Sequence, residues 1–265
     1  MNLIFAGPTI SCIEITQYSD CVCLPPIRQG DILKHLSKKP VSIGIIDGYF
    51  EGAPAIWHKE ILYALDQGVY VYGSSSMGAL RAAELHSFGM QGIGQIFEWY
   101  RDGVITDDDE VAVLHGPEET HYLTASEPMV NIRATLDLAT QRQIINRCEQ
   151  KSLLAVAKNT FYKKRSWRNL LADMQDSIGD DLSKEQFVEW VQLNKLDLKK
   201  QDAIQLLQTI QKACEKHTKI HCANFHFEWT NVWDAAYQEY VGYQRDSKSV
   251  AEHQQVLDQL RLMPD

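Results

Sequence analysis

The first half of the sequence alternates short apolar runs with amphipathic segments, and this alternation limits the folds that the chain can adopt. Three runs have the length and composition of buried strands: residues 3–7, 41–46 and 69–72. Three segments that follow them place apolar residues at helical spacing: residues 30–36, 54–66 and 77–86. Strands and helices that alternate with short connections are typical of a parallel sheet with helices packed on its faces. We therefore expect an α/β fold, with a parallel-sheet, Rossmann-like N-terminal domain.

The second half of the sequence has a different pattern. After about residue 125 the strand-like runs disappear, and long helical periodicities such as residues 203–210 take their place. We therefore expect an α/β catalytic domain over residues 1–125 and an α-helical C-terminal region over residues 126–265. Residues 158–168 combine basic and aromatic side chains, either as a docking face for an acidic partner or as a solvated helix face whose aromatic rings pack inward.

Charge and composition exclude some classes of partner. The chain has 265 residues and a net charge of −9, which argues against nonspecific binding to nucleic acid or to anionic lipid. It contains no apolar stretch of membrane-spanning length, and its first residues lack the basic segment of a signal peptide, so we expect a cytoplasmic protein. In that compartment the six scattered cysteines are expected to be free thiols: Cys12, Cys21, Cys23, Cys148, Cys214 and Cys222.

Two segments are expected at the carboxyl edge of the sheet, where open parallel sheets bind their ligands. They are Asp47-Gly48-Tyr49, after the second run, and residues 74–78, after the third. The pattern Ser74-x-Ser76-x-Gly78 approximates the strand-to-helix turn that exposes a nucleophilic hydroxyl, although a serine replaces its first glycine. One of these serines could instead cap the following helix, which the pattern alone favours, and the pattern does not distinguish Ser74, Ser75 and Ser76.

A nucleophilic serine needs a base, and the helix after Asp47 offers two candidates in its first turns. His58 and Lys59 are adjacent, so they point about 100° apart and only one of them is expected to face the site. His115 is a further candidate base, because it ends the apolar run 111–114, which we expect to be another strand.

The helix after the serine turn carries an ion-pairing combination. Arg81 and Glu84 are three residues apart and therefore share one face of the helix. Arg81 could bind a carboxylate-like anion with its planar guanidinium group, or the two side chains could simply pair with each other.

The sequence predicts neither a metal site nor a cofactor. The acidic run at residues 107–110 could bind a divalent cation, but such runs are more often solvated turns or helix starts. The only cluster with metal-like spacing has its two pairs one residue out of phase: His217, His221, Cys222 and His226. No glycine-rich phosphate-binding motif occurs.

Several segments together resemble the TfuA family. They follow one another in the same order over roughly residues 3 to 135: Phe5-Ala6-Gly7-Pro8, Pro25-Pro26-x-x-x-Gly30-Asp31, Ile45-Ile46-Asp47-Gly48-Tyr49-Phe50, Trp57-His58-Lys59-Glu60-Ile61-Leu62, Ser75-Ser76-Met77-Gly78-Ala79-Leu80-Arg81-Ala82-Ala83-Glu84-Leu85 and Asp108-Asp109-Glu110-Val111-Ala112-Val113-Leu114-His115-Gly116-Pro117. This ordered set is far more specific than any single motif.

The resemblance implies a partner of YcaO-type enzymes, which use ATP to activate backbone amides of peptides or proteins. TfuA-like proteins assist in converting such amides to thioamides. They are thought to hydrolyse the C-terminal thiocarboxylate of a ubiquitin-like sulfur carrier protein, releasing sulfide, and to help the YcaO-type enzyme to engage its peptide or protein substrate. A thiocarboxylate is an acyl group, and its attack builds an oxyanion of the kind that the serine turn could stabilise.

These expectations combine into a hypothesis of acyl hydrolysis. Ser76 attacks the thiocarboxylate carbon, Lys59 or His58 takes its proton, Asp47 orients the base, and His115 is the alternative base. The expected substrate-binding residues surround them: Tyr49, Ser75, Met77, Gly78, Arg81 and Glu84. Amides near Met77 and Gly78 would hold the oxyanion, and Arg81 would neutralise the thiocarboxylate. The alternative is a noncatalytic adaptor that binds the YcaO-type partner and its peptide substrate.

Overall fold

Five parallel strands form one sheet within the part of the chain that the computed structural model describes, residues 1–172, 184–214 and 223–242. The spatial order is β2-β1-β3-β4-β5, with β1 at Asn2–Phe5, β2 at Val22–Leu24, β3 at Ser42–Ile45, β4 at Tyr70–Ser74 and β5 at Gln91–Ile93. The expected α/β fold with a parallel sheet and a helical C-terminal region is confirmed. Strands β2 and β5 are additional to the three that the apolar runs predicted.

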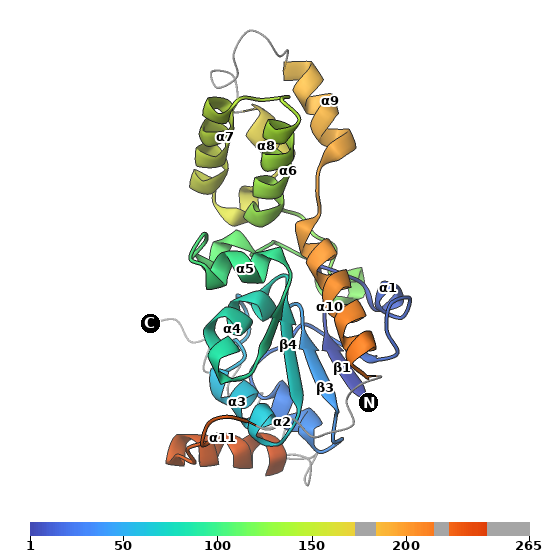
Figure 1. Ribbon diagram of the computed structural model, residues 1–265, viewed down its shortest axis with the longest axis vertical. Coiled ribbons are helices and arrows are strands. Elements are labelled where there is room, and N and C mark those ends of the chain that lie inside the picture. Colours follow the sequence, from blue (N-terminus) through green and yellow to red (C-terminus); the bar gives the residue numbers. More distant parts are fainter. Residues whose placement is uncertain (173–183, 215–222, 243–265) are drawn as a thin grey trace.

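Helices cover both faces of this sheet and form a second lobe beyond it (Figure 1). Those of the α/β part are α1 (Cys12–Ile15), α2 (Asp31–Leu36), α3 (His58–Asp66), α4 (Met77–Leu85) and α5 (Gln95–Arg101). Those that follow are α6 (Met129–Gln141), α7 (Arg147–Asn159), α8 (Trp167–Ala172), α9 (Lys184–Asn194), α10 (Leu198–Cys214) and α11 (Asn231–Gly242). Short 3₁₀ turns lie at His86–Phe88, Asp108–Glu110, Glu118–Thr120 and Tyr162–Lys164.

The alternation of side chains along the strands divides the core between the two faces of the sheet. In β1, Leu3 and Phe5 join the core that contains the buried sides of α2, α3, α4 and α5. Ile4 points to the other face, where it packs with Leu206 and Ile210 of α10. The near-continuous apolar character of the central strands therefore follows from their burial on both faces.

The C-terminal half of the chain contributes to three cores, because Val130 and Leu198 also join the one formed around α2 to α5. Helices α6 to α9 bury a cluster of their own, which includes Leu136, Leu153 and Phe187, and they form the upper lobe in Figure 1. Helix α10 leaves this lobe and lies against the sheet. Residues 1–125 and 126–265 thus share one hydrophobic core through α10.

Two glycines bring α4 unusually close to the strands beneath it. A β-carbon at Gly78 would lie 1.8 Å from the carbonyl oxygen of Ile45, and one at Gly73 would lie 2.1 Å from the carbonyl oxygen of Gly78. Only glycine allows this approach, because any side chain would overlap the backbone oxygen. The serine turn between these two glycines is therefore held tightly against β3.

Two local expectations are wrong. Residues 111–114 do not form a strand, because they follow the 3₁₀ turn Asp108–Glu110 and only His115 pairs, through an isolated antiparallel bridge with Thr124. Cys12 and Cys23 form a disulfide, so they are not free thiols. Within the described residues, no helix combines the length and apolar character needed to cross a membrane.

Candidate active site

The strand order places a crevice where β1 and β3 lie side by side and their following loops diverge. Asp47 follows β3 and is buried at this point. Its Oδ2 accepts hydrogen bonds from the amides of Gly7 (2.9 Å) and Thr9 (3.0 Å), and its Oδ1 accepts one from the Thr9 hydroxyl (2.6 Å). The Asp47 carboxylate therefore ties together the two loops that form the crevice.

The serine turn lies on the next strand along the edge. Ser75 has a φ of 66°, an uncommon conformation for a residue other than glycine, and its hydroxyl donates to the carbonyl oxygen of Lys199 at 2.6 Å. Ser76 holds the N-cap position of α4 but makes no capping hydrogen bond with its side chain. The capping role that the sequence also allowed is thus absent at Ser76, and its side chain lines a pocket.

This pocket, about 240 Å³ in volume, joins four residues that the sequence singled out: Asp47, Tyr49, Ser76 and His115. The Nδ1 atom of His115 lies 2.7 Å from the carbonyl oxygen of Gly116. A carbonyl oxygen can only accept, so this contact places the proton on Nδ1 and leaves the Nε2 lone pair of a neutral imidazole available as a base.

Most of the residues that line this pocket lie within a segment that matches a known protein family. Residues 47–166 match the family model of TfuA-like protein. Over this segment, a little under half of the chain, the sequence is similar to the TfuA-like family. No curated protein matches the sequence. The resemblance seen in the sequence is thereby confirmed for this segment, and all four predicted pocket residues fall within the TfuA-like span.

The structure places the other two candidate bases away from Ser76. His58 Nε2 lies 2.7 Å from Oε2 of Glu84, and Lys59 donates to the hydroxyl of Thr230 at 3.1 Å. Both line a separate, open pocket together with Arg81. No contact among the described residues joins His58 or Lys59 to Ser76, so the side-chain proximity that the sequence suggested is not observed.

Arg81 and Glu84 form the intrahelical pair that was the alternative to anion binding. Arg81 Nη1 lies 2.7 Å from Glu84 Oε2, and its Nε donates to the carbonyl oxygen of Ile56 at 3.2 Å. Burial raises the pKa of Glu84, but hydrogen bonds from His58 and Arg81 outweigh this effect and lower the pKa. The guanidinium group therefore uses two of its five N–H donors within the chain.

The expected oxyanion donors are only partly available. The Gly78 amide donates to the carbonyl oxygen of Ile46 at 3.3 Å, so it is committed to the backbone. The Met77 side chain packs against Gly48, where a β-carbon would lie 2.8 Å from its Cγ. In the first turn of α4, the backbone amide of Met77 is the one that has no hydrogen-bond acceptor among the described residues.

Lys199, in the first turn of α10, is the residue of this site that sequence reasoning missed. Its side chain is 4% exposed, its Nζ donates to the carbonyl oxygen of Val111 at 3.0 Å, and it lies 3.9 Å from Oδ1 of Asp47. Burial lowers the pKa of Lys199, against the opposing effect of Asp47 and other carboxylates. Nothing in the local sequence distinguishes it from Lys195 or Lys200, because its burial depends on the docking of α10.

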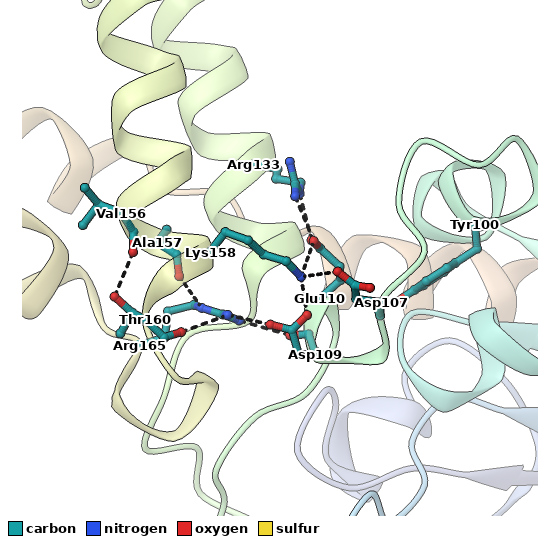
Figure 2. A network of polar contacts seen from close by, with 10 residues as sticks. All are labelled: Tyr100, Asp107, Asp109, Glu110, Arg133, Val156, Ala157, Lys158, Thr160 and Arg165. Atoms are coloured by element: carbon teal, nitrogen blue, oxygen red, sulfur yellow. Dashed lines mark hydrogen bonds and ion pairs between the residues drawn. The ribbon is translucent and has the colours of Figure 1, made fainter.

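The acidic run does not form an open metal site. The carboxylates of Asp107, Asp109 and Glu110 lie close enough to share an ion, but cationic side chains fill the space between them (Figure 2). Lys158 pairs with all three carboxylates, and Arg165 contacts Asp109 at 2.8 Å. Burial alone would lower the pKa of Lys158, but these hydrogen bonds raise it to about 12.

This network connects the α/β part to the helical lobe. Arg133 of α6 binds both oxygens of the buried Glu110 at 2.8 Å. Arg165 is buried and also donates to the carbonyl oxygens of Ala157, Thr160 and Asp109, so four of its five N–H donors have acceptors within the chain. The basic residues of segment 158–168 therefore include structural partners of the acidic run. Of the histidine-rich cluster, His217, His221 and Cys222 lie outside the described residues.

Proposed function

We propose that the protein hydrolyses the C-terminal thiocarboxylate of a ubiquitin-like sulfur carrier protein and delivers the sulfide to a YcaO-type enzyme for backbone thioamidation of a peptide or protein. The observation that carries this proposal is the pocket at the sheet edge, which joins a serine hydroxyl, a histidine and a buried aspartate within the TfuA-like span. This set supplies the residue types that acyl transfer requires.

The reaction would proceed in two steps. The Ser76 oxygen attacks the thiocarboxylate carbon while Nε2 of His115 accepts the hydroxyl proton. The imidazolium then gives this proton to the sulfur as the C–S bond breaks, so hydrosulfide leaves and the histidine is neutral again. Water then attacks the acyl-serine ester with the same histidine as base, and the carrier leaves with a carboxylate end. In this proposal His115 takes the role for which His58 and Lys59 were first considered, because it lines the same pocket as Ser76.

The test uses the purified protein alone with a thiocarboxylated carrier, and sulfide release is measured over time. We expect Ser76→Ala and His115→Gln to lower the rate about 100-fold or more, since each removes a group that acts on the reacting atoms. His58→Gln is the matched control and should stay within about twofold of the wild type, because its imidazole pairs with Glu84 on the outer face of α4.

The outcomes separate the possible mechanisms. Full activity of Ser76→Ala would exclude a covalent intermediate and leave direct attack by water with His115 as base. Loss of activity in His58→Gln together with retention in His115→Gln would show that the base has been assigned to the wrong histidine.

A noncatalytic adaptor is the second candidate, and one observation favours it. Ser76 is only 2% exposed, so its hydroxyl is poorly accessible in this conformation. An adaptor would release no sulfide by itself but would increase thioamide formation when added to a YcaO-type enzyme and its peptide. Sulfide release without the partner enzyme would exclude this candidate.

A further inference from the structure

We propose that Lys199 is the anion-binding residue of this site and holds the terminal carboxylate or thiocarboxylate of an extended peptide tail. Lys199 belongs to α10, outside the TfuA-like span of residues 47–166. The identification of the sulfur-bearing tail rests on the proposed function, whereas the binding of a carboxylate end stands on the geometry alone.

The ammonium group of Lys199 is buried with few partners. It carries three N–H donors, and among the described residues the Val111 carbonyl is its one hydrogen-bond acceptor. The nearest carboxylate oxygen, Oδ1 of Asp47, lies at 3.9 Å, beyond hydrogen-bond distance. A buried cation with unused donors is costly unless an anion or another acceptor approaches it. The lowered pKa of Lys199 is consistent with this incomplete compensation.

Asp47 does not supply the missing acceptor, because its nearest oxygen stays 3.9 Å from the ammonium nitrogen. Both carboxylate oxygens of Asp47 receive hydrogen bonds from the loop after β1, through Gly7 and Thr9. Those donors hold the carboxylate in place and partly neutralise its charge. An incoming anion would therefore meet the ammonium of Lys199 as its main electrostatic partner.

A polar pocket gives access to Lys199. It has a volume of about 200 Å³, and the residues that line it include Thr9, Thr124 and Ser126. Pro8 and Val113 line both this pocket and the one that contains Ser76 and His115. The two pockets thus adjoin, and an extended chain could place its end in one while its last peptide group lies in the other.

The charges around this pocket favour the singly charged carboxylate end of a peptide over a phosphate group. Lys195 and Lys199 contribute two positive charges, and Glu127, Asp197 and the adjacent Asp47 contribute three carboxylates. A phosphate dianion would be repelled by the surplus of negative charge, whereas one carboxylate can pair with one ammonium. Arg81, the residue first expected to bind the anion, lines a different pocket and pairs with Glu84.

Fluorescence anisotropy tests this inference with a labelled eight-residue peptide that ends in glycine, once with a free carboxylate and once with a C-terminal amide. We expect the wild type to bind the carboxylate form about tenfold more tightly, and Lys199→Met to lose this preference. Lys200→Met is the matched control, because Lys200 is the next residue of α10, pairs with Glu14 and should leave the preference unchanged.

Each outcome decides the question. Equal binding of the two peptides by the wild type would overturn the inference without any variant. Retention of the preference in Lys199→Met, with a wild-type melting curve, would overturn it as well. Lys199→Arg keeps the charge and should keep most of the preference, so a defect of folding is distinguishable from the loss of the anion site. Stronger competition by inorganic phosphate than by acetate would exclude a site selective for a single charge.

The sulfide assay separates this inference from the proposed function. If the wild type releases no sulfide but its carboxylate preference depends on Lys199, the anion site stands and the hydrolysis does not. If sulfide release proceeds with unchanged kcat and KM in Lys199→Met, hydrolysis stands and the anion site is refuted.

Discussion

Glu60 offers a quantitative test of the packing between α2 and α3. Its side chain is buried on α3, and both carboxylate oxygens lie 2.9 Å from the amide nitrogen of Gly30, just before α2. Burial raises the pKa of Glu60 to about 7 from its usual 4.5, and this effect exceeds the lowering by the Gly30 hydrogen bond. At about 1.4 kcal/mol for each tenfold change in proton affinity, the native state loses about 3 kcal/mol when Glu60 must ionise.

The sign of the pH dependence of stability follows from the pKa values of Glu60 in the folded and unfolded states. Between pH 4.5 and about 7 the folded protein binds more protons at Glu60 than the unfolded chain does, so this group makes stability fall as the pH rises through that range. Above the folded pKa the loss is complete. Glu60→Gln cannot ionise, and its amide oxygen can still accept from Gly30, so it lacks the pH-dependent cost.

Urea unfolding of the wild type and of Glu60→Gln at pH 5 and pH 8 measures the effect. We expect the stability of the variant relative to the wild type to increase by about 2 to 3 kcal/mol from the lower to the higher pH. Asp66→Asn, on the exposed end of the same helix, is the control and should show no comparable change. An equal difference at the two pH values would refute the argument that burial controls this carboxyl group.

Two further predictions concern stability, and a third concerns the disulfide. Gly78→Ala should destabilise the protein by about 3 kcal/mol or more in urea unfolding, because its methyl group would overlap a carbonyl oxygen of β3. Arg165→Met should cost about 3 to 5 kcal/mol in the same assay, since it leaves buried acceptors unpaired, whereas the exposed Arg168→Met should stay within about 0.5 kcal/mol; equal effects would contradict the burial argument. Alkylation of Cys12 and Cys23 in the unfolded protein should require prior reduction, and labelling without it would disprove the disulfide.

The serine turn and its flanking elements could be predicted because their determinants are local. The apolar run 69–72, the helical spacing after Met77 and the glycine at position 78 all lie within a few residues of one another. Asp47 could be placed at the same edge because it follows a strand that is parallel to β4. Asp47 and Ser76 line one pocket, as this rule predicts. His115 lines it as well, but it was expected there because residues 111–114 were predicted to form a strand, and that prediction is wrong.

The features that could not be predicted depend on contacts between distant segments. Strands β2 and β5 are three residues long and only partly buried, so they lack the periodicity that identified the others. The periodicity of residues 203–210 predicted a helix, but it did not show that the helix lies on the sheet and brings Lys199 to Asp47. His58 was expected near the serine turn because α3 begins at that edge, yet its ring turns to Glu84 on the outer surface of α4.

The docking of α10 has a consequence for the order in which the site is assembled during synthesis. The strands and the serine turn leave the ribosome first, while one face of the sheet, which includes Ile4 and Tyr72, still lacks the helix that covers it. Only when residues 198–210 have emerged can that face be sealed and the ammonium of Lys199 take its place beside Asp47. A nascent chain that stopped near residue 166 would carry the whole TfuA-like span and yet hold an unfinished pocket.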